Sequence, residues 1–203
     1  MLHRTTFQEF QQLASSGSRV VVSKEIFGDV LTPVRAFQAL ASDCDDVALL
    51  DSSDHPTAQD ACVYIGIEAI ATFSSKGDEV VVTEAGVTQK HQGDAFQALR
   101  EFYNRNKCDS IHSLAKFAGG MIGFVAYDAV RLFEDIPDRH PNEDDVPDLM
   151  FKCYGINIVF DKRTGKVLVS RSVEVEEDLE VLYKATMEEI DAIIQKMISA
   201  QSG

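Results

Sequence analysis

The sequence predicts an α+β fold in which mostly antiparallel sheets pack as a sandwich, with helices on the outside. Strand-like runs of apolar and β-branched residues follow one another across short turns that contain glycine, at 76–78, 84–86 and 162–166. Amphipathic segments with helix caps flank these runs instead of following every strand. This order disfavours the alternating strands and helices of a doubly wound nucleotide-binding fold.

Capping residues mark where helices are expected to begin. Thr6 and Glu9 form the pattern of a capping box. Thr32 precedes a proline that suits the first helical position, and Asp94 is a good N-cap for a third helix. A longer amphipathic helix is expected at about 177–199, with an apolar stripe made of Leu179, Leu182, Met187, Ile190, Ile194 and Met197.

Strands are expected between these helices, and two of them carry a specific prediction. The run at 46–53 is predicted to be a buried strand that ends in polar residues, and the run at 61–75 is predicted to be a long strand with a bend at Gly66. The remaining strands are expected at 19–23, 79–83, 87–92, 149–161 and 167–173, with another in the apolar run that follows Gly120.

Composition and charge exclude several classes of function. The net charge of −14 repels phosphate backbones, so we expect no nucleic-acid partner. No apolar run approaches the ~20 residues that a membrane span needs, and the first ten residues lack the apolar region of a signal peptide. The cysteines include no Cys-x-x-Cys pair, so we expect buried free thiols in a reducing cytoplasm; they are Cys44, Cys62, Cys108 and Cys153.

The stretch GGMIGFVAYDAVRLFEDIP, at 119–137, raises the question of a phosphate-binding loop. Its glycines, Gly119, Gly120 and Gly123, come before and within an apolar strand rather than between a strand and a helix. We therefore expect them to let another backbone approach closely. Asp128 is expected to cap the short helical turn that follows, and Arg131 to pair with Asp128 or with the acidic loop after it.

No catalytic set stands out in the sequence. Neither a Gly-x-Ser-x-Gly elbow nor a His-Glu-x-x-His motif occurs. His55 shares a loop with Asp51, Asp54 and Asp60, but scattered loop acids are usually solvated, so we predict no metal ligands here. The residues alone thus indicate an α+β domain without a recognisable catalytic constellation.

Four ordered stretches resemble the N-terminal domain of anthranilate synthase component I. They are GDVLTPVRAFQAL at 28–40, ALLDSSD at 48–54, CVYIG at 62–66, and the 119–137 stretch with its follower PDLMF at 147–151. The last is similar to the family pattern GG-x-x-G-x-x-x-YD-x-x-R-x-FE-x-LP, followed by PD, and is the most specific of the four. Component I of aminodeoxychorismate synthase shares this domain, so the resemblance includes both enzymes.

The resemblance implies that residues 1–203 are a regulatory domain and that the catalytic, chorismate-binding domain is absent. The full-length enzyme would be a lyase that converts chorismate, with ammonia from a glutamine amidotransferase subunit (component II), into anthranilate and pyruvate. The resemblance implies Mg²⁺ for that full-length enzyme and no cofactor for this segment. We expect this segment by itself to be inactive.

The resemblance also implies a feedback site for tryptophan at Leu50, Asp51 and Ser52. A carboxylate can accept hydrogen bonds from the ligand's ammonium group, a Ser hydroxyl can add another, and apolar neighbours can cover an indole. Asp51 is one methylene shorter than the family's Glu, and Ala61 stands near the point where the family has a basic residue. The alternative, that Asp51 and Ser52 only end a strand, remains open, as does a stand-alone small-molecule binding module.

Overall fold

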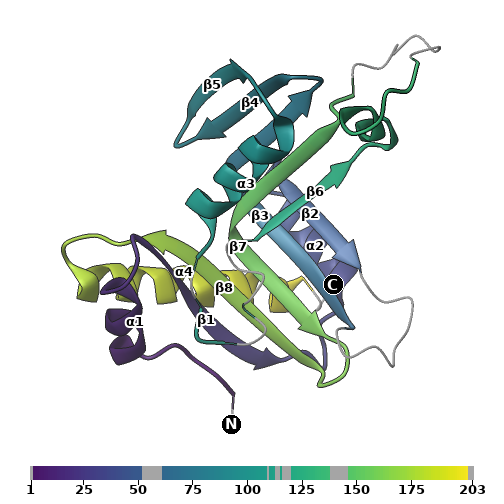
Figure 1. Cartoon of the computed structure of the whole chain (residues 1–203). Coiled ribbons are helices and arrows are strands. Elements are labelled where there is room, and N and C mark those ends of the chain that lie inside the picture. Colours follow the sequence, from purple (N-terminus) through teal and green to yellow (C-terminus); the bar gives the residue numbers. More distant parts are fainter. Residues whose placement is uncertain are drawn as a thin grey trace. The chain divides into compact units, whose positions relative to one another are not determined.

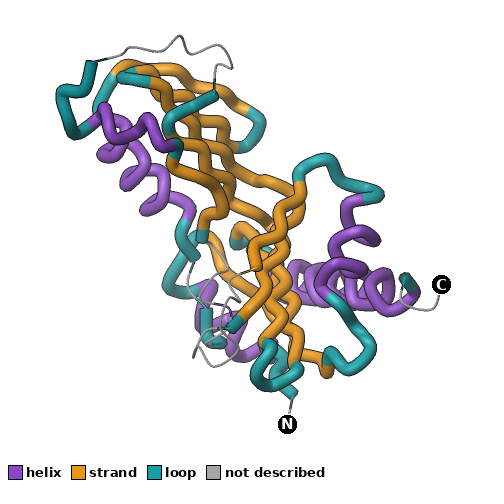
Figure 2. The backbone as a smooth tube through the Cα atoms, turned by 90° about the vertical axis from the view of Figure 1, so that its right-hand side faces the viewer, coloured by secondary structure: helices purple, strands orange, loops and turns teal. Residues whose placement is uncertain are grey.

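The computed structural model describes residues 2–51, 61–108, 110–112, 115, 120–137 and 146–200. The chain forms two compact units, each of which combines strands with helices (Figures 1 and 2). The first unit contains residues 1–69, 107–120 and 154–203, and the second contains 70–106 and 121–153. Two long strands, β3 (Cys62–Lys76) and β7 (Leu149–Asp161), contribute residues to both.

The helices of the first unit begin at the residues that the sequence indicates. In α1 (Phe7–Ala14), the Thr6 hydroxyl accepts from the Glu9 amide, and the Glu9 carboxylate accepts from the Thr6 amide, which confirms the capping box. Thr32 caps α2 (Pro33–Ala41) with its hydroxyl, which accepts from the Arg35 amide. The long helix α4 (Leu179–Ser199) begins at Asp178, whose carboxylate accepts from the Val181 amide.

The strands of the first unit pair in antiparallel fashion. β1 (Arg19–Phe27) pairs with β8 (Lys166–Glu174) along its whole length, and β8 pairs with the second half of β7. β2 (Val47–Asp51) pairs with the first half of β3 and has no other strand neighbour among the described residues, so it is an edge strand. Consequently the prediction of a buried strand is wrong: Leu49 and Leu50 are 37% and 47% exposed.

Alternation along these strands separates two packed faces. On one face, apolar side chains of β1, β3, β7 and β8 pack with residues of α1, α2 and α4. The α4 stripe is buried there as expected, through Met187, Ile190, Ile194 and Met197. On the other face a smaller cluster forms from Val21, Cys62, Ala115, Val159 and Leu168. Helices therefore cover the outer side of the larger core, as predicted.

The second unit is built around two hairpins and one helix. β4 (Glu79–Glu84) pairs with the second half of β3 and with β5 (Val87–Gln92), and β6 (Met121–Val125) pairs with the first half of β7. The predicted turns are confirmed: Gly77 has φ +56°, and Ala85 and Gly86 have φ +49° and +75°. Helix α3 (Ala95–Asn106) buries Phe102 against Phe73 of β3, with ring centroids 5.6 Å apart.

Gly123 shows why the glycine-rich stretch is structural. It lies opposite Phe151 in the β6–β7 pair, and a Cβ at Gly123 would stand 1.9 Å from the Met150 carbonyl oxygen. Only glycine fits such an approach of two backbones, which confirms the structural interpretation at this position. Gly119 lies outside the described residues.

The turn after β6 differs from the prediction in one respect. The short 3₁₀ helix η2 (Tyr127–Leu132) begins one residue before Asp128, and no side chain caps it. The prediction that Asp128 is the N-cap is therefore wrong. Asp128 lies in the first turn, where its negative charge interacts favourably with the positive end of the aligned peptide dipoles. Its expected pairing with Arg131 is confirmed, with 3.4 Å between Oδ1 and Nε.

The predicted α+β class with antiparallel pairing is confirmed. The strand order is β1-β8-β7-β3-β4-β5, with β2 added to β3 and β6 to β7. The pairs β1–β8, β7–β8, β2–β3, β3–β4, β4–β5 and β6–β7 are all antiparallel. Within β3 the backbone has an irregularity at Glu68, which has φ +61°, two residues after the predicted bend at Gly66. The described strands belong to a single hydrogen-bonded sheet. The sheets that the sequence predicts are therefore continuous with each other through β3 and β7.

Candidate functional site

Asp51 is the last residue of β2 and lies opposite Val63 of β3. Its side chain is 48% exposed, and both carboxylate oxygens accept from the Lys162 ammonium group, at 3.0 and 3.2 Å. Lys162 follows the last residue of β7 and is 111 positions away in sequence. The fold therefore places a carboxylate and an ammonium group together at the open edge of the first unit.

Leu50 and Asp51 point to opposite faces of β2, because successive side chains alternate along a strand. Asp51 shares the face of Val63, which belongs to the helix-covered core, whereas Leu50 lies opposite Tyr64, which packs with the smaller cluster. Ser52, the third predicted ligand residue, lies outside the described residues. The structure thus brings Asp51 to a polar partner and leaves Leu50 on the other face.

Ala61 lies beside the same charged pair. Its carbonyl oxygen accepts from the Lys162 amide at 3.1 Å, and its own side chain is buried. The resemblance implies a basic residue near position 61; the basic group that pairs with Asp51 in the structure is that of Lys162. Sequence reasoning missed Lys162, because the turn that contains it could be predicted but not its position next to β2.

The turn that carries Lys162 is held in place by Asp161. The Asp161 carboxylate accepts from the amides of Arg163 and Thr164 and from the Thr164 hydroxyl. Burial would raise the pKa of Asp161, but these hydrogen bonds outweigh it and hold the pKa below its ordinary value. Gly165 closes the turn with φ +67°. The backbone of Lys162 is therefore fixed at both ends.

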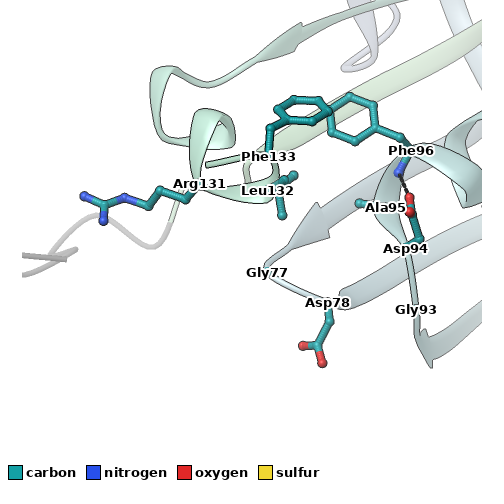
Figure 3. A pocket seen from close by; sticks show the side chains of 9 residues that line it. All are labelled: Gly77, Asp78, Gly93, Asp94, Ala95, Phe96, Arg131, Leu132 and Phe133. Carbon is teal, nitrogen blue, oxygen red and sulfur yellow. Dashed lines mark hydrogen bonds between the residues drawn. The ribbon is translucent and has the colours of Figure 1, made fainter. Parts of the chain in front are cut away.

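A separate pocket of 480 Å³ opens in the second unit, between the start of α3, the β3–β4 turn and η2 (Figure 3). The rings of Phe96 and Phe133 contact each other at a tilt, with centroids 4.6 Å apart, while Arg131 extends away from them. The Asp94 carboxylate is engaged in capping α3, since it accepts from the amides of Phe96 and Gln97. The described lining residues include no Ser, Cys, His or Lys side chain, so they offer no nucleophile with an adjacent base.

Glu25 is the most buried charged residue among the described part of the first unit, with 4% of its surface exposed. Its carboxylate accepts from the Lys166 ammonium at 3.0 Å and from the His3 amide at 3.1 Å. Burial alone would raise the pKa of Glu25, but these two partners hold it below its ordinary value. Nε2 of His112 lies 3.8 Å from the Glu25 carboxylate, and the His112 ring contacts the His3 ring at a tilt. Burial and the neighbouring His3 lower the pKa of His112. This cluster ties the N-terminal residues to β1 and β8.

Within the described ranges, no three His, Cys, Asp or Glu side chains are grouped as metal ligands. The residues described here therefore do not fit the Mg²⁺ that the resemblance implies for a full-length enzyme. The predicted loop acids Asp54 and Asp60, with His55, lie outside those ranges. Among the helices described, none is long and apolar enough to cross a membrane.

Comparison with known proteins assigns this chain to a family. Residues 45–202, most of the chain, match the family described as chorismate binding enzyme, and the chain belongs to that family. Its similar relatives include anthranilate synthases. The chain is 26% identical over 97% of its length to the anthranilate synthase alpha subunit 2, chloroplastic, of Arabidopsis thaliana, and 27% identical over 79% of its length to anthranilate synthase component 1 of Neisseria meningitidis serogroup B.

These matches cover only part of each relative. The chain spans 34% of the length of both proteins. Among solved structures, anthranilate synthase component I of Streptococcus pneumoniae TIGR4 matches with a TM-score of 0.50 and 21% identity, over 85% of this chain and 36% of that one. That similarity supports the fold.

Proposed function

We propose that this chain is the N-terminal, tryptophan-sensing domain of an anthranilate synthase component I. The observation that carries the proposal is the match of 97% of the chain to about a third of an anthranilate synthase subunit. The ordered motifs at 28–40, 48–54, 62–66 and 119–151 support the same assignment. The longer enzyme would be a cytoplasmic lyase that forms anthranilate and pyruvate from chorismate and ammonia.

In this proposal the chemistry is divided between polypeptide segments. The catalytic residues and the Mg²⁺ site belong to a chorismate-binding domain outside these 203 residues, and a glutamine amidotransferase subunit supplies ammonia. Tryptophan binds at the end of β2 and favours one arrangement of the enzyme over another, which lowers the activity by a shift in populations. Asp51, an exposed carboxylate at that strand end, is suited to accept from the ligand's ammonium group.

The first experiment is to follow the gene past the codon for Gly203 and to purify the longer protein. With its amidotransferase, glutamine and chorismate, we expect anthranilate as product and inhibition by L-tryptophan. Formation of aminodeoxychorismate without tryptophan inhibition would instead support aminodeoxychorismate synthase, which shares the domain. A stop codon after Gly203 would support a stand-alone binding module.

Two measurements on the 203-residue chain test the division of labour. We expect no conversion of chorismate, and turnover by this chain would contradict the proposal. We also expect tryptophan binding that is weak or undetectable in calorimetry, because part of the pocket is expected from the catalytic domain. A micromolar affinity would show that these residues form the whole site.

A further inference from the structure

The pocket between the start of α3, the β3–β4 turn and η2 has an apolar side and an acidic side. All nine residues that line it belong to the second unit. In Figure 3 the rings of Phe96 and Phe133 lie above the space with Leu132 beside them, and Asp78 and Asp94 lie below. The volume of 480 Å³ falls within the ~300–1,000 Å³ that is usual for small-molecule sites.

Backbone donors at the rim of this pocket are already used. The Gly77 amide donates to the Asp148 carboxylate at 2.8 Å, and the Gly93 amide donates to the Asp78 carbonyl oxygen at 2.8 Å. In the first turn of α3, two amides donate to Oδ1 of Asp94. The start of a helix commonly binds anions, but here a carboxylate of the chain itself takes that role.

The guanidinium group of Arg131 is also engaged outside the pocket. Its Nε lies 3.4 Å from Oδ1 of Asp128, and its Nη1 donates to the Ile136 carbonyl oxygen at 3.0 Å. In Figure 3 the side chain extends away from the two rings. An anionic ligand would therefore meet two aspartates and find these donors occupied.

The aspartates, by contrast, keep part of their capacity to accept hydrogen bonds. A carboxylate offers about four lone-pair positions. Among the described residues, Asp94 accepts through Oδ1 alone. The Gln92 side-chain amide, in the orientation that satisfies its hydrogen bonds, donates to Asp78 at 2.7 Å (Oδ2) and 2.8 Å (Oδ1). Both carboxylates can thus accept from a group that carries several N–H donors.

The aromatic side suits the same kind of ligand. Phe133 is 69% exposed, and its ring contacts Phe96, which packs against the core of the second unit. The face of an aromatic ring attracts a cation, and the same surface can cover an aliphatic chain or another ring. Rings and carboxylates around one space match a ligand with a cationic head and an apolar body.

We propose that this pocket binds an organic cation, a primary ammonium group on an apolar body. The ammonium donates to Asp78 and Asp94, and the body packs on Phe96 and Phe133. Such a group can come from a free amine or from a lysine side chain of another protein. The inference goes beyond the proposed function and does not depend on it, because Asp51 belongs to the first unit.

Three ligands of similar size test the role of charge. Phenethylamine carries an ammonium group, phenethyl alcohol is neutral and hydrocinnamate is anionic. NMR titration of the ¹⁵N-labelled chain follows the amides of Gly77, Gly93, Phe96 and Phe133 into the millimolar range. We expect the amine to bind about fivefold more tightly than the alcohol, as for a cation at an exposed aromatic site, and hydrocinnamate not to bind.

A fourth ligand identifies the source of the cation. Nα-acetyl-lysine N-methylamide represents a lysine side chain of a partner protein, whereas phenethylamine represents a free amine. Tighter binding of the lysine derivative would support a protein partner, and tighter binding of phenethylamine would support a small molecule. Either result supports a site for an ammonium group.

Three variants and two matched controls assign the contacts. Asp94→Asn removes a charge and keeps the cap of α3, because asparagine also accepts from helix amides. Asp94→Asn, Asp78→Asn and Phe133→Leu should each weaken phenethylamine about threefold, and the two Asn variants should leave phenethyl alcohol unchanged. Asp178→Asn, at the N-cap of α4, and Phe27→Leu, at a residue that is 61% exposed, should change neither affinity.

Several outcomes would overturn the inference. Equal affinities for the amine and the alcohol would mean that the carboxylates take no part, and tighter binding of hydrocinnamate would reverse the expected sign of charge. Absence of shifts at the four pocket amides would exclude the site. Shifts at Asp51 and Val63 instead would place the amine at the end of β2, which overturns this inference and leaves the proposed tryptophan sensing in place.

Discussion

The backbone of Gly123 lies directly against the carbonyl of Met150, at a distance where no side chain can be added. A Cβ at Gly123 would stand 1.9 Å from that oxygen and 2.6 Å from the Phe151 Cα. Both contacts are with backbone atoms of β7, the partner strand of β6, so rotation of a side chain cannot relieve them. The glycine is required by the pairing itself.

Gly123→Ala should therefore destabilise the protein by at least about 2 kcal/mol, because the β6–β7 pair must separate to admit the methyl group. Urea denaturation followed by circular dichroism measures the loss. Gly17→Ala is the matched control, since its nearest new contact would be 3.5 Å away, and it should change the free energy of unfolding by less than about 0.5 kcal/mol. Equal stabilities of the two variants would refute the close approach.

Acidification should destabilise the fold through His112. Burial, the neighbouring His3 and Lys166 lower the pKa of His112 below 6.5, and Glu25 opposes this only in part. The unfolded chain then binds the proton more readily than the folded chain. The contribution of His112 to the free energy of unfolding is therefore fully present above pH 6.5 and is lost as the pH drops toward the lowered pKa. His112→Gln should flatten the dependence of the free energy of unfolding on pH in that window.

Two comparisons make the pH experiment specific. His91→Gln changes an exposed histidine of β5 and should leave the profile as in the wild type. Glu25 contributes to stability in a different pH range. Against the effect of burial, Lys166 and the His3 amide hold the pKa of Glu25 below 4.5, so its contribution to the free energy of unfolding is lost only below pH 4.5. A profile that stays unchanged in His112→Gln would exclude His112 as the titrating group.

Asp94→Ala should cost about 1 kcal/mol of stability, because two amides at the start of α3 lose their acceptor. Asp94→Ser, which can still accept from one of these amides, should lose less than half as much. The measurement is the urea midpoint at constant slope. If the serine and alanine variants were equally unstable, the loss would come from the charge of Asp94 rather than from its cap.

Thiol accessibility should divide the cysteines into two pairs. Cys62 and Cys153 are 5% and 1% exposed, whereas Cys44 and Cys108 are half-buried, and all are free thiols. We expect Ellman's reagent to modify Cys44 and Cys108 in the native protein and the other two only after unfolding. Mass spectrometry of the labelled peptides identifies the sites, and rapid labelling of Cys153 would contradict its buried position.

Local signals explain the parts of the fold that the sequence predicts well. The capping box at Thr6, the N-caps at Thr32 and Asp94, and the glycine turns each depend on residues a few positions apart, and the structure has all of them. The burial of β2 was predicted wrongly, because an apolar run does not reveal whether a strand has one neighbour or two. Its partner, β3, covers only one side.

The candidate site also depends on contacts between residues that are far apart in the sequence, which local patterns do not predict. Asp51 was found from a motif, while Lys162 depends on the meeting of segments 111 positions apart, which no local pattern records. The cluster around Glu25 likewise joins residue 3, β1, residue 112 and β8. Periodicity predicts which face of a strand is apolar, but only the strand order decides which polar side chains meet.

The path of the chain between its two units limits how this architecture can be inherited and rearranged. The polypeptide passes from one unit to the other after residues 69, 106, 120 and 153, and two of these passages lie inside the strands β3 and β7. An exchange of either unit between related genes would need cuts at all four places, two of them within a hydrogen-bonded ladder. We therefore expect duplication, fusion and recombination of the gene to transmit the two units together.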